Sequence, residues 1–203
     1  MGNAYFTIDE GVDKNIATWS RTVDAATVHV QKVAVDEAFM ATYTITVFTA
    51  VTISSADKHI VQIMAGGTNR VYLRRLRFWQ AANATTTQNI SLVVYRLTTA
   101  GTGGTSYTPV ALDPSSSAAG ATAMTVPTSK GTEGSLLDQW FPTIHTTATT
   151  VGLRPMLDLS WDGLREQSPT IAAGTSNGIA VKCQSSDATA TIAWQATICE
   201  ASY

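Results

Sequence analysis

The chain has 203 residues, a formal net charge of −2 and a sequence pI near 5.9; 44% of its residues are hydrophobic and only 14% are charged. Average soluble domains carry about 25% charged residues, so this composition argues against a coiled coil, a charged helix bundle and a highly charged disordered chain. The near-neutral balance also argues against a nucleic-acid binder, which usually needs a basic surplus. The length suits one β-rich domain with an appended arm.

Residues 1–40 differ from the rest of the chain. They hold six acids and little regular apolar alternation: Asp9, Glu10, Asp13, Asp24, Asp36 and Glu37. We interpret this region as an extended N-terminal arm, partly strand, that settles on a partner surface. A helix over Ala25–Met40 is the alternative, because several of its residues recur at near-helical spacing. Its valines favour the arm, since β-branched side chains lose freedom in helices.

Residues 41–203 are expected to form the folded domain. About thirty threonines alternate with Val, Ile, Tyr and Ala along the chain, and β-branched residues of this kind favour strands. The clearest run is YTITVFTAVTI, in which Tyr43, Ile45 and Val47 share one face. The predicted strands are 43–53, 59–64, 71–79, 89–97, 136–144, 151–159, 179–184 and 189–199. This spacing predicts an all-β, antiparallel β-sandwich that resembles a jelly roll.

Three local features qualify this pattern. The alternation between Val71 and Trp79 breaks phase at Arg74-Arg75, which predicts a β-bulge. Ser185-Ser186-Asp187 is typical of a hairpin turn between the last two strands. The segment from Thr98 to Thr122 is long and rich in small residues, and such loops are usually functional or mobile.

The motifs of common enzymes are missing from the sequence. His29, His59 and His145 are isolated and fall in no metal-binding frame. Gly101 to Gly104 lacks the Lys-Ser/Thr ending of a phosphate-binding loop, and no Gly-x-Ser-x-Gly elbow is present. We therefore expect no enzyme activity, and no catalytic, cofactor-binding or metal site.

One acidic and aromatic combination needs separate mention. Asp158 and Asp162 flank Trp161, an arrangement that glycan sites use. The simpler interpretation is that Asp162-Gly163 forms a turn and that Trp161 covers the core.

Four arginines crowd one predicted strand: Arg70, Arg74, Arg75 and Arg77, with Tyr72, Phe78 and Trp79 between and beside them. A basic strand with aromatic residues can bind single-stranded nucleic acid. Because the net charge is −2, we favour ion pairs with acids of a neighbouring strand or subunit. Arginine is enriched at protein interfaces, so these four residues are the candidate interface.

Neither export nor membrane insertion is expected. The first residues, MGNAYFTIDEGVDKN, contain no apolar run of signal-peptide length. No stretch approaches the roughly 18 apolar residues of a spanning helix. Two cysteines, Cys183 and Cys199, are too few for a disulfide framework, and we expect free thiols in a reducing cytoplasm.

One part of the chain resembles a known class of proteins. Residues 94–134 read VYRLTTAGTGGTSYTPVALDPSSSAAGATAMTVPTSKGTEG. This stretch resembles a segment of virion structural proteins of tailed bacteriophages, in which an arginine-leucine pair precedes a Thr-Gly-rich loop, a Pro-x-x-Leu-Asp stretch and Ala-Thr-Ala-Met. The segments NRVYLRRLRFWQA and PTIAAGTSNGIAVK look similar to the same class. The resemblance covers roughly residues 43–200.

The resemblance implies a non-enzymatic structural protein of a phage particle, made in the host bacterial cytoplasm and located in the virion. The leading expectation is a capsid decoration (cement) protein that binds the major capsid protein or other virion proteins. A homo-oligomer is expected, with a trimer favoured, and neither nucleic acid nor membrane is an expected partner. The alternative is a tail or head-fibre component that binds host-surface glycans.

Overall fold

The computed structural model describes residues 18–23, 26–31, 40–53, 57–147, 155–161 and 167–201. The chain divides into two compact units, Met1–Phe39 and Met40–Tyr203. In the first unit, β1 (Thr18–Val23) and β2 (Ala26–Gln31) pair as an antiparallel hairpin. The helix considered for Ala25–Met40 is therefore wrong over β2, and residues 32–39 lie outside the described part.

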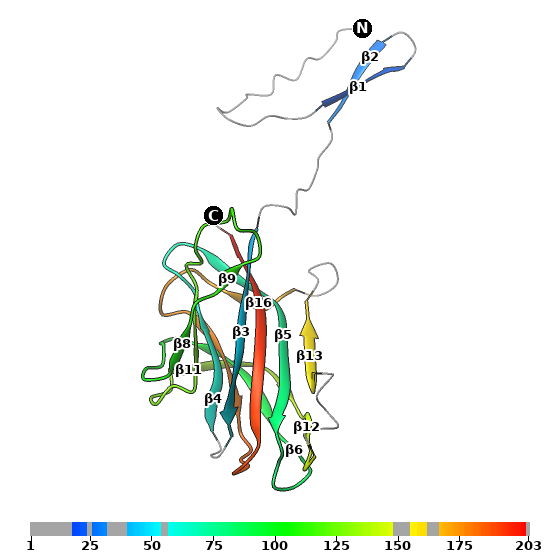
Figure 1. Ribbon diagram of the computed structural model, residues 1–203. Coiled ribbons are helices and arrows are strands. Elements are labelled where there is room, and N and C mark those ends of the chain that lie inside the picture. The colour runs from blue at the N-terminus through cyan, green and yellow to red at the C-terminus, as the bar shows by residue number, and fades with distance from the viewer. Residues whose placement is uncertain are drawn as a thin grey trace. The chain divides into compact units, whose positions relative to one another are not determined.

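The described part of the second unit is built from strands, turns and loops. The strands are β3 (Ala41–Thr52), β4 (Lys58–Met64), β5 (Arg70–Ala82), β6 (Gln88–Asn89), β7 (Leu92–Leu97), β8 (Thr105–Tyr107), β9 (Val110–Ala111), β10 (Thr122–Thr125), β11 (Glu133–Trp140), β12 (Thr143–Ile144), β13 (Leu157–Ser160), β14 (Thr170–Ile171), β15 (Gly178–Cys183) and β16 (Thr191–Ala201). One sheet has the order β11-β7-β15-β4-β10-β8, and the other has the order β13-β5-β16-β3-β9. Figure 1 shows β13, β5, β16 and β3 of the second sheet side by side. The short β6 and β12 pair with each other, and β14 pairs with β5.

The pairing of the long strands is that of a jelly roll. The first strand of the unit, β3, pairs with the last, β16, and β4 pairs with β15. Further inward, β5 pairs with β13 and β7 pairs with β11. These nested strand pairs together form one long antiparallel hairpin, which folds back on itself. As a result, β16 also pairs with β5, and β15 also pairs with β7. Two antiparallel sheets in this arrangement confirm the predicted sandwich and its jelly-roll form.

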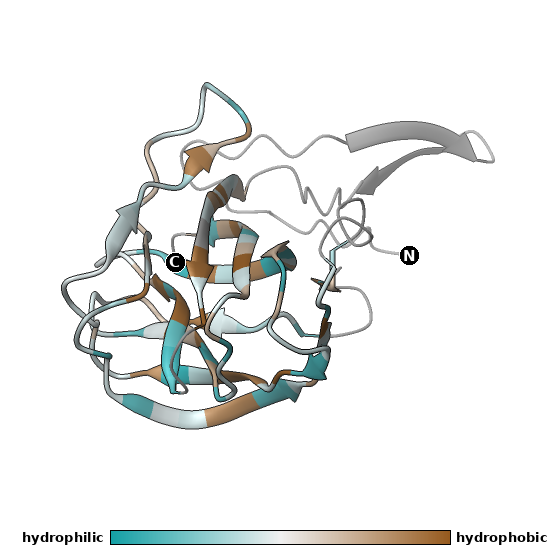
Figure 2. Ribbon diagram, turned by 60° about the horizontal axis from the view of Figure 1, so that its bottom comes forward, coloured by the Kyte–Doolittle hydropathy of each residue, from teal (hydrophilic) through white to brown (hydrophobic). Residues whose placement is uncertain are grey.

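The core lies between the two sheets. Hydrophobic and polar residues alternate along the strands (Figure 2), and the predicted inward residues Tyr43, Ile45 and Val47 are buried. On β16, the predicted apolar face is buried as well and includes Trp194, a large residue in the middle of the core. Removing this apolar surface from water is what holds the two sheets together.

Most of the strand predictions are confirmed, with changes at their ends. The β5 bulge is present, because Leu73 pairs with Ile198 while Arg75 pairs with its neighbour Thr197. The predicted strand 89–97 is split into β6 and β7, and 136–144 is split into β11 and β12. The second break contains Pro142, which lacks the N–H that a continuing strand needs. Residues 151–154 of another predicted strand lie outside the described part.

The predicted hairpin at Ser185–Asp187 is wrong. The strands on either side of it lie in different sheets, since β15 pairs with β4 and β7 whereas β16 pairs with β3 and β5. The segment therefore crosses from one sheet to the other. Turn-forming composition does not specify which sheet the chain enters next.

The segment Thr98–Thr122 is more ordered than its composition predicts. It contains β8 and β9, and β10 begins at its last residue. The carboxylate of the buried Glu200 accepts hydrogen bonds from the backbone N–H groups of Gly120, at 3.0 Å, and Ala121, at 2.6 Å. One end of the segment is thereby tied to the last strand of the fold.

Two further observations concern the cysteines and the helices required to cross a membrane. Cys183 and Cys199 are both buried free thiols. Within the described ranges, no helix has the length and apolar character required to cross a membrane.

Candidate functional site

The four arginines predicted as an interface lie along β5. Arg75 and Arg77 alternate with the buried Leu76 and Phe78, so their side chains point away from the core, onto the outer face of the sheet. Arg70 begins the strand and Arg74 lies at the bulge. Two of the four predicted interface residues, Arg75 and Arg77, thus lie on the outer face of the sheet.

A chain of polar contacts crosses this outer face. Asp158 on β13 accepts from Arg75 Nε at 2.9 Å and Arg75 Nη2 at 2.6 Å, and it also contacts Arg77 Nε at 3.3 Å. Arg77 donates to Gln195 on β16 at 3.5 Å, and Gln195 donates to Thr46 on β3 at 3.2 Å. The contacts follow the strand register, in which Asp158 opposes Arg77, Arg77 opposes Gln195 and Gln195 opposes Thr46.

For Arg75 and Arg77 the partner is thus an acid of the neighbouring strand, one of the two possibilities that the sequence left open for the four arginines. The Arg75 guanidinium holds the pKa of Asp158 below its usual value. The Asp158 combination considered for glycan binding is engaged in these ion pairs, and Trp161 packs against the core. Asp162 lies outside the described residues.

We expect Arg75→Ala to lower the free energy of unfolding by at most about 1 kcal/mol, because partly exposed ion pairs contribute little. The side chains of Arg75 and Asp158 are 41% and 32% exposed. Urea denaturation and far-ultraviolet circular dichroism would measure the effect, and the spectrum should keep its β form. A loss of several kcal/mol would show that the pair is part of the folding core instead.

The same outer face becomes apolar beyond the arginines. Val47 pairs with Trp194 and Val51 with Ile192, so residues 48–50 of β3 lie opposite Ala193 alone and bulge from the sheet. This bulge turns Phe48 into solvent, where its side chain is 86% exposed. Phe48 borders a hollow of about 420 Å³ whose lining includes Trp79 and Ala193. Exposed apolar surface of this kind marks sites of protein contact.

The edge of the sheet beside Phe48 is open. On the side away from β16, β3 pairs with β9 at Tyr43 and Thr44, and among the described residues no strand continues that pairing toward Thr52. Unpaired N–H and C=O groups along an edge strand are a template for a strand of another chain. The arginines, Phe48 and this edge together form what we call the β3–β5 surface.

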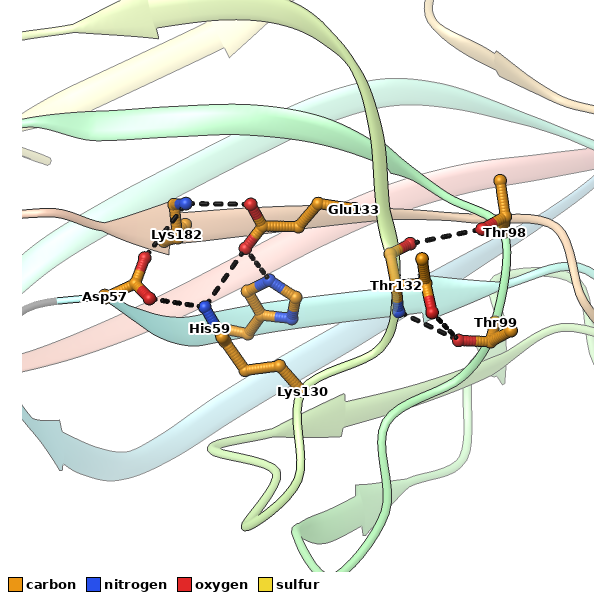
Figure 3. Close-up of polar contacts among 8 residues, drawn as sticks. All are labelled: Asp57, His59, Thr98, Thr99, Lys130, Thr132, Glu133 and Lys182. Atoms are coloured by element: carbon orange, nitrogen blue, oxygen red, sulfur yellow. Dashed lines mark hydrogen bonds and ion pairs between the residues drawn. The ribbon is translucent and has the colours of Figure 1, made fainter.

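The other sheet carries a cluster of charged side chains (Figure 3). Glu133 at the start of β11 contacts His59 Nε2 at 2.9 Å and Lys182 Nζ at 2.8 Å. Asp57 contacts Lys182 at 2.9 Å and Lys130 at 2.5 Å. Lys182 also lies 4.5 Å from the centre of the Tyr95 ring. Two carboxylates therefore neutralise two lysines around a histidine.

The contacts of this cluster hold the loop before β11 in place, and they do not form a site that is open to solvent. The His59 side chain is fully buried, so it cannot reach a substrate. Burial lowers the pKa of His59, which keeps the ring neutral against the opposing effect of Glu133. Nearby, Thr132 N–H donates to Thr99 Oγ1 at 2.8 Å, which ties the chain before β11 to the chain after β7. Sequence reasoning missed the cluster because its members come from three separate parts of the chain, residues 57–59, 130–133 and Lys182.

In the part of the chain that the structure describes, no group of three or more His, Cys, Asp or Glu side chains could hold a metal ion. Comparison with protein-family models, curated proteins and solved structures finds no match to this chain. The β3–β5 surface, which combines an exposed phenylalanine with a hollow beside it, is the candidate functional site.

Proposed function

We propose that the chain is a non-enzymatic structural protein of a bacteriophage particle. In this proposal it is a capsid decoration (cement) protein that binds the major capsid protein lattice and stabilises it. It is made in the host cytoplasm, becomes part of the virion and acts as a homo-oligomer, with a trimer favoured. The proposal includes no catalysis, nucleic acid or membrane.

The observation that carries the proposal is the β3–β5 surface. It combines the 86% exposed Phe48, a hollow of about 420 Å³ and a strand edge that no described strand covers beyond β9. A lattice-binding protein needs such a preformed contact face, since binding by a rigid surface costs little ordering entropy. The resemblance of residues 94–134 to phage virion proteins supports the same role.

In the proposed function, the N-terminal unit makes a second contact with the particle. Residues 1–39 form a compact unit of their own, with a short hairpin of Thr-rich strands. We propose that this arm engages a neighbouring subunit or the capsid, while the jelly roll binds through the β3–β5 surface. Two linked contacts raise the total avidity well above that of either contact alone.

We expect Phe48→Asp to abolish or strongly weaken co-sedimentation of the full chain with phage particles, because a charge would be buried in an apolar contact. Phe141→Asp is the matched control: Phe141 is also exposed, at 62%, but lies at the edge of the other sheet. Both variants should keep the wild-type circular dichroism spectrum. Equal binding by both variants and wild type would contradict the assigned surface.

Electron microscopy of the particle tests the role itself. The chain should appear on the capsid surface at sites of local three-fold symmetry. Density on a tail or on a projecting fibre would instead favour the alternative of a tail or head-fibre component. Analytical ultracentrifugation of the free protein would test the trimer.

A further inference from the structure

A second hollow opens at the side of the sandwich, away from the β3–β5 surface. It has a volume of about 320 Å³ and reaches from β5 and β7 to the residues that follow β13. Its inner wall is formed by Leu73, Leu76 and Val94, all buried between the sheets. We call it the side cleft. Its size falls in the range of small-ligand sites, roughly 300–1,000 Å³.

The cleft has a structural cause in the bulge of β5. β13 pairs with β5 as far as Arg75, and β14 pairs with it from Tyr72 onward. Between these strands, Trp161 N–H donates to Arg74 O at 2.8 Å and Leu73 N–H donates to Pro169 O at 3.0 Å, while residues 162–166 lie outside the described part. Among the described residues, the strand pairing along this side of β5 is interrupted here, and the buried Leu73 and Leu76 line the cleft at this point.

Two tryptophans line the cleft, Trp140 at the end of β11 and Trp161 after β13. Both are only half-buried, whereas Trp194 in the core is 1% exposed. Packing alone does not require an indole ring to remain partly in water. Half-exposed rings beside a cavity offer flat apolar faces to a ligand.

The described rim of the cleft is polar. Among the described residues it carries Arg96, Asp138 and Gln167. Arg96 Nη1 donates to Thr170 O at 2.7 Å, which ties the guanidinium to β14. Guanidinium N–H groups donate, carboxylate oxygens accept and a side-chain amide does both. The described rim thus has one positive and one negative group, and these two give no preference for a charged ligand.

We propose that the side cleft binds a neutral saccharide. Such a ligand has apolar ring faces that match the indoles and hydroxyl groups that both donate and accept hydrogen bonds. A nucleotide or an acidic glycan would need a surplus of cations, which the described residues of the rim do not offer. This inference goes beyond the proposed structural role and does not depend on it, because the cleft and the β3–β5 surface are formed by different residues.

The test uses the labelled full chain on an array of neutral and acidic microbial oligosaccharides. Binding to neutral members is expected. The neutral oligosaccharide that gives the strongest signal is then titrated in solution, with tryptophan fluorescence as the readout. Trp161→Ala and Trp140→Ala should each raise its Kd at least about tenfold, because each removes one stacking surface. Trp79→Ala, in the hollow beside Phe48, is the matched control and should leave Kd unchanged.

Substitutions at the rim of the side cleft provide a second test of saccharide binding, in case a tryptophan variant fails to fold. Asp138 and Gln167 are exposed, so Asp138→Ala and Gln167→Ala should fold normally and weaken binding several-fold. The proposal is overturned if no neutral oligosaccharide binds, if only acidic ones bind, or if Trp79→Ala alone removes binding. Co-sedimentation with particles is measured separately, so failure here leaves the proposed structural role unaffected.

Discussion

We expect Asp187→Ala to lower the free energy of unfolding by about 2–4 kcal/mol, because it leaves the buried N–H group of Ala190 and the part-buried N–H groups of Thr85 and Thr189 without their acceptor. Asp187 is 5% exposed and lies in the segment that crosses between the sheets. Its carboxylate accepts from the backbone N–H groups of Thr85 at 3.0 Å, Thr189 at 2.9 Å and Ala190 at 2.8 Å. It thereby joins the chain before β6 to the start of β16.

The electrostatics of Asp187 agree with this expectation. Burial raises the pKa of its carboxyl, but the N–H groups of Ala190, Thr189 and Thr85 outweigh burial and hold the pKa far below its usual value. The ionised form is therefore the one that the fold stabilises, and that stabilisation is lost as the pH falls through the lowered pKa.

Urea denaturation at neutral pH would measure the change. Asp187→Asn should fall between wild type and Asp187→Ala, because one amide oxygen can still accept some of the bonds. Asp138→Ala is the control: Asp138 is exposed, and the effect should stay within about 0.5 kcal/mol. A loss below about 1 kcal/mol for Asp187→Ala would mean that water replaces the carboxylate and that the crossing segment does not depend on it.

We expect Glu133→Gln to lower the free energy of unfolding by about 2–3 kcal/mol at pH 7 and to make the remaining stability less sensitive to acid. Glu133 is the link between the buried His59 and Lys182, whose side chains are 0% and 7% exposed. Without its charge, Lys182 keeps only the exposed Asp57 as an acidic partner in the cluster. Removing one partner of a buried ion pair is costly because the other charge remains desolvated.

The direction of the pH dependence follows from three groups. Burial lowers the pKa of His59, so the unfolded chain takes up a proton below about pH 6.5 that the folded chain resists. Lys130 and Lys182 lower the pKa of Asp57 to about 2. Burial opposes ionisation of Glu133, but Lys182 and His59 hold its pKa below the usual value. In all three cases the unfolded state binds more protons in acid, so stability falls as the pH falls.

Urea midpoints measured between about pH 7 and pH 2.5 would test this dependence. Wild type should lose stability steadily as the pH falls from about 6.5, and the loss should be shallower below about pH 4.5 in Glu133→Gln, which has one fewer carboxylate to protonate. Asp138→Asn is a suitable control, since Asp138 is exposed and lies outside this cluster. Identical pH profiles for wild type and Glu133→Gln would show that Glu133 does not contribute to the pH dependence of stability.

Local patterning in the sequence was sufficient for most strands and for their inward faces. Successive side chains of a strand point to opposite faces, so alternation by itself places Tyr43, Ile45 and Trp194 in the core. The same periodicity located the bulge of β5 at Arg74-Arg75, because a bulge shifts the phase by one residue. These predictions depend on neighbouring residues alone, and for this reason they could be made without a structure.

Only the tertiary structure decided which strands pair and which distant side chains meet. Ser185–Asp187 has the composition of a hairpin turn, yet it crosses between the sheets because β15 and β16 each find partners elsewhere in the chain. Asp57, Lys130, Glu133 and Lys182 come together through the pairing of β4, β15, β7 and β11. Alternation specifies a face for each side chain but contains no information about the neighbouring strand, so these contacts emerge only when the jelly roll closes.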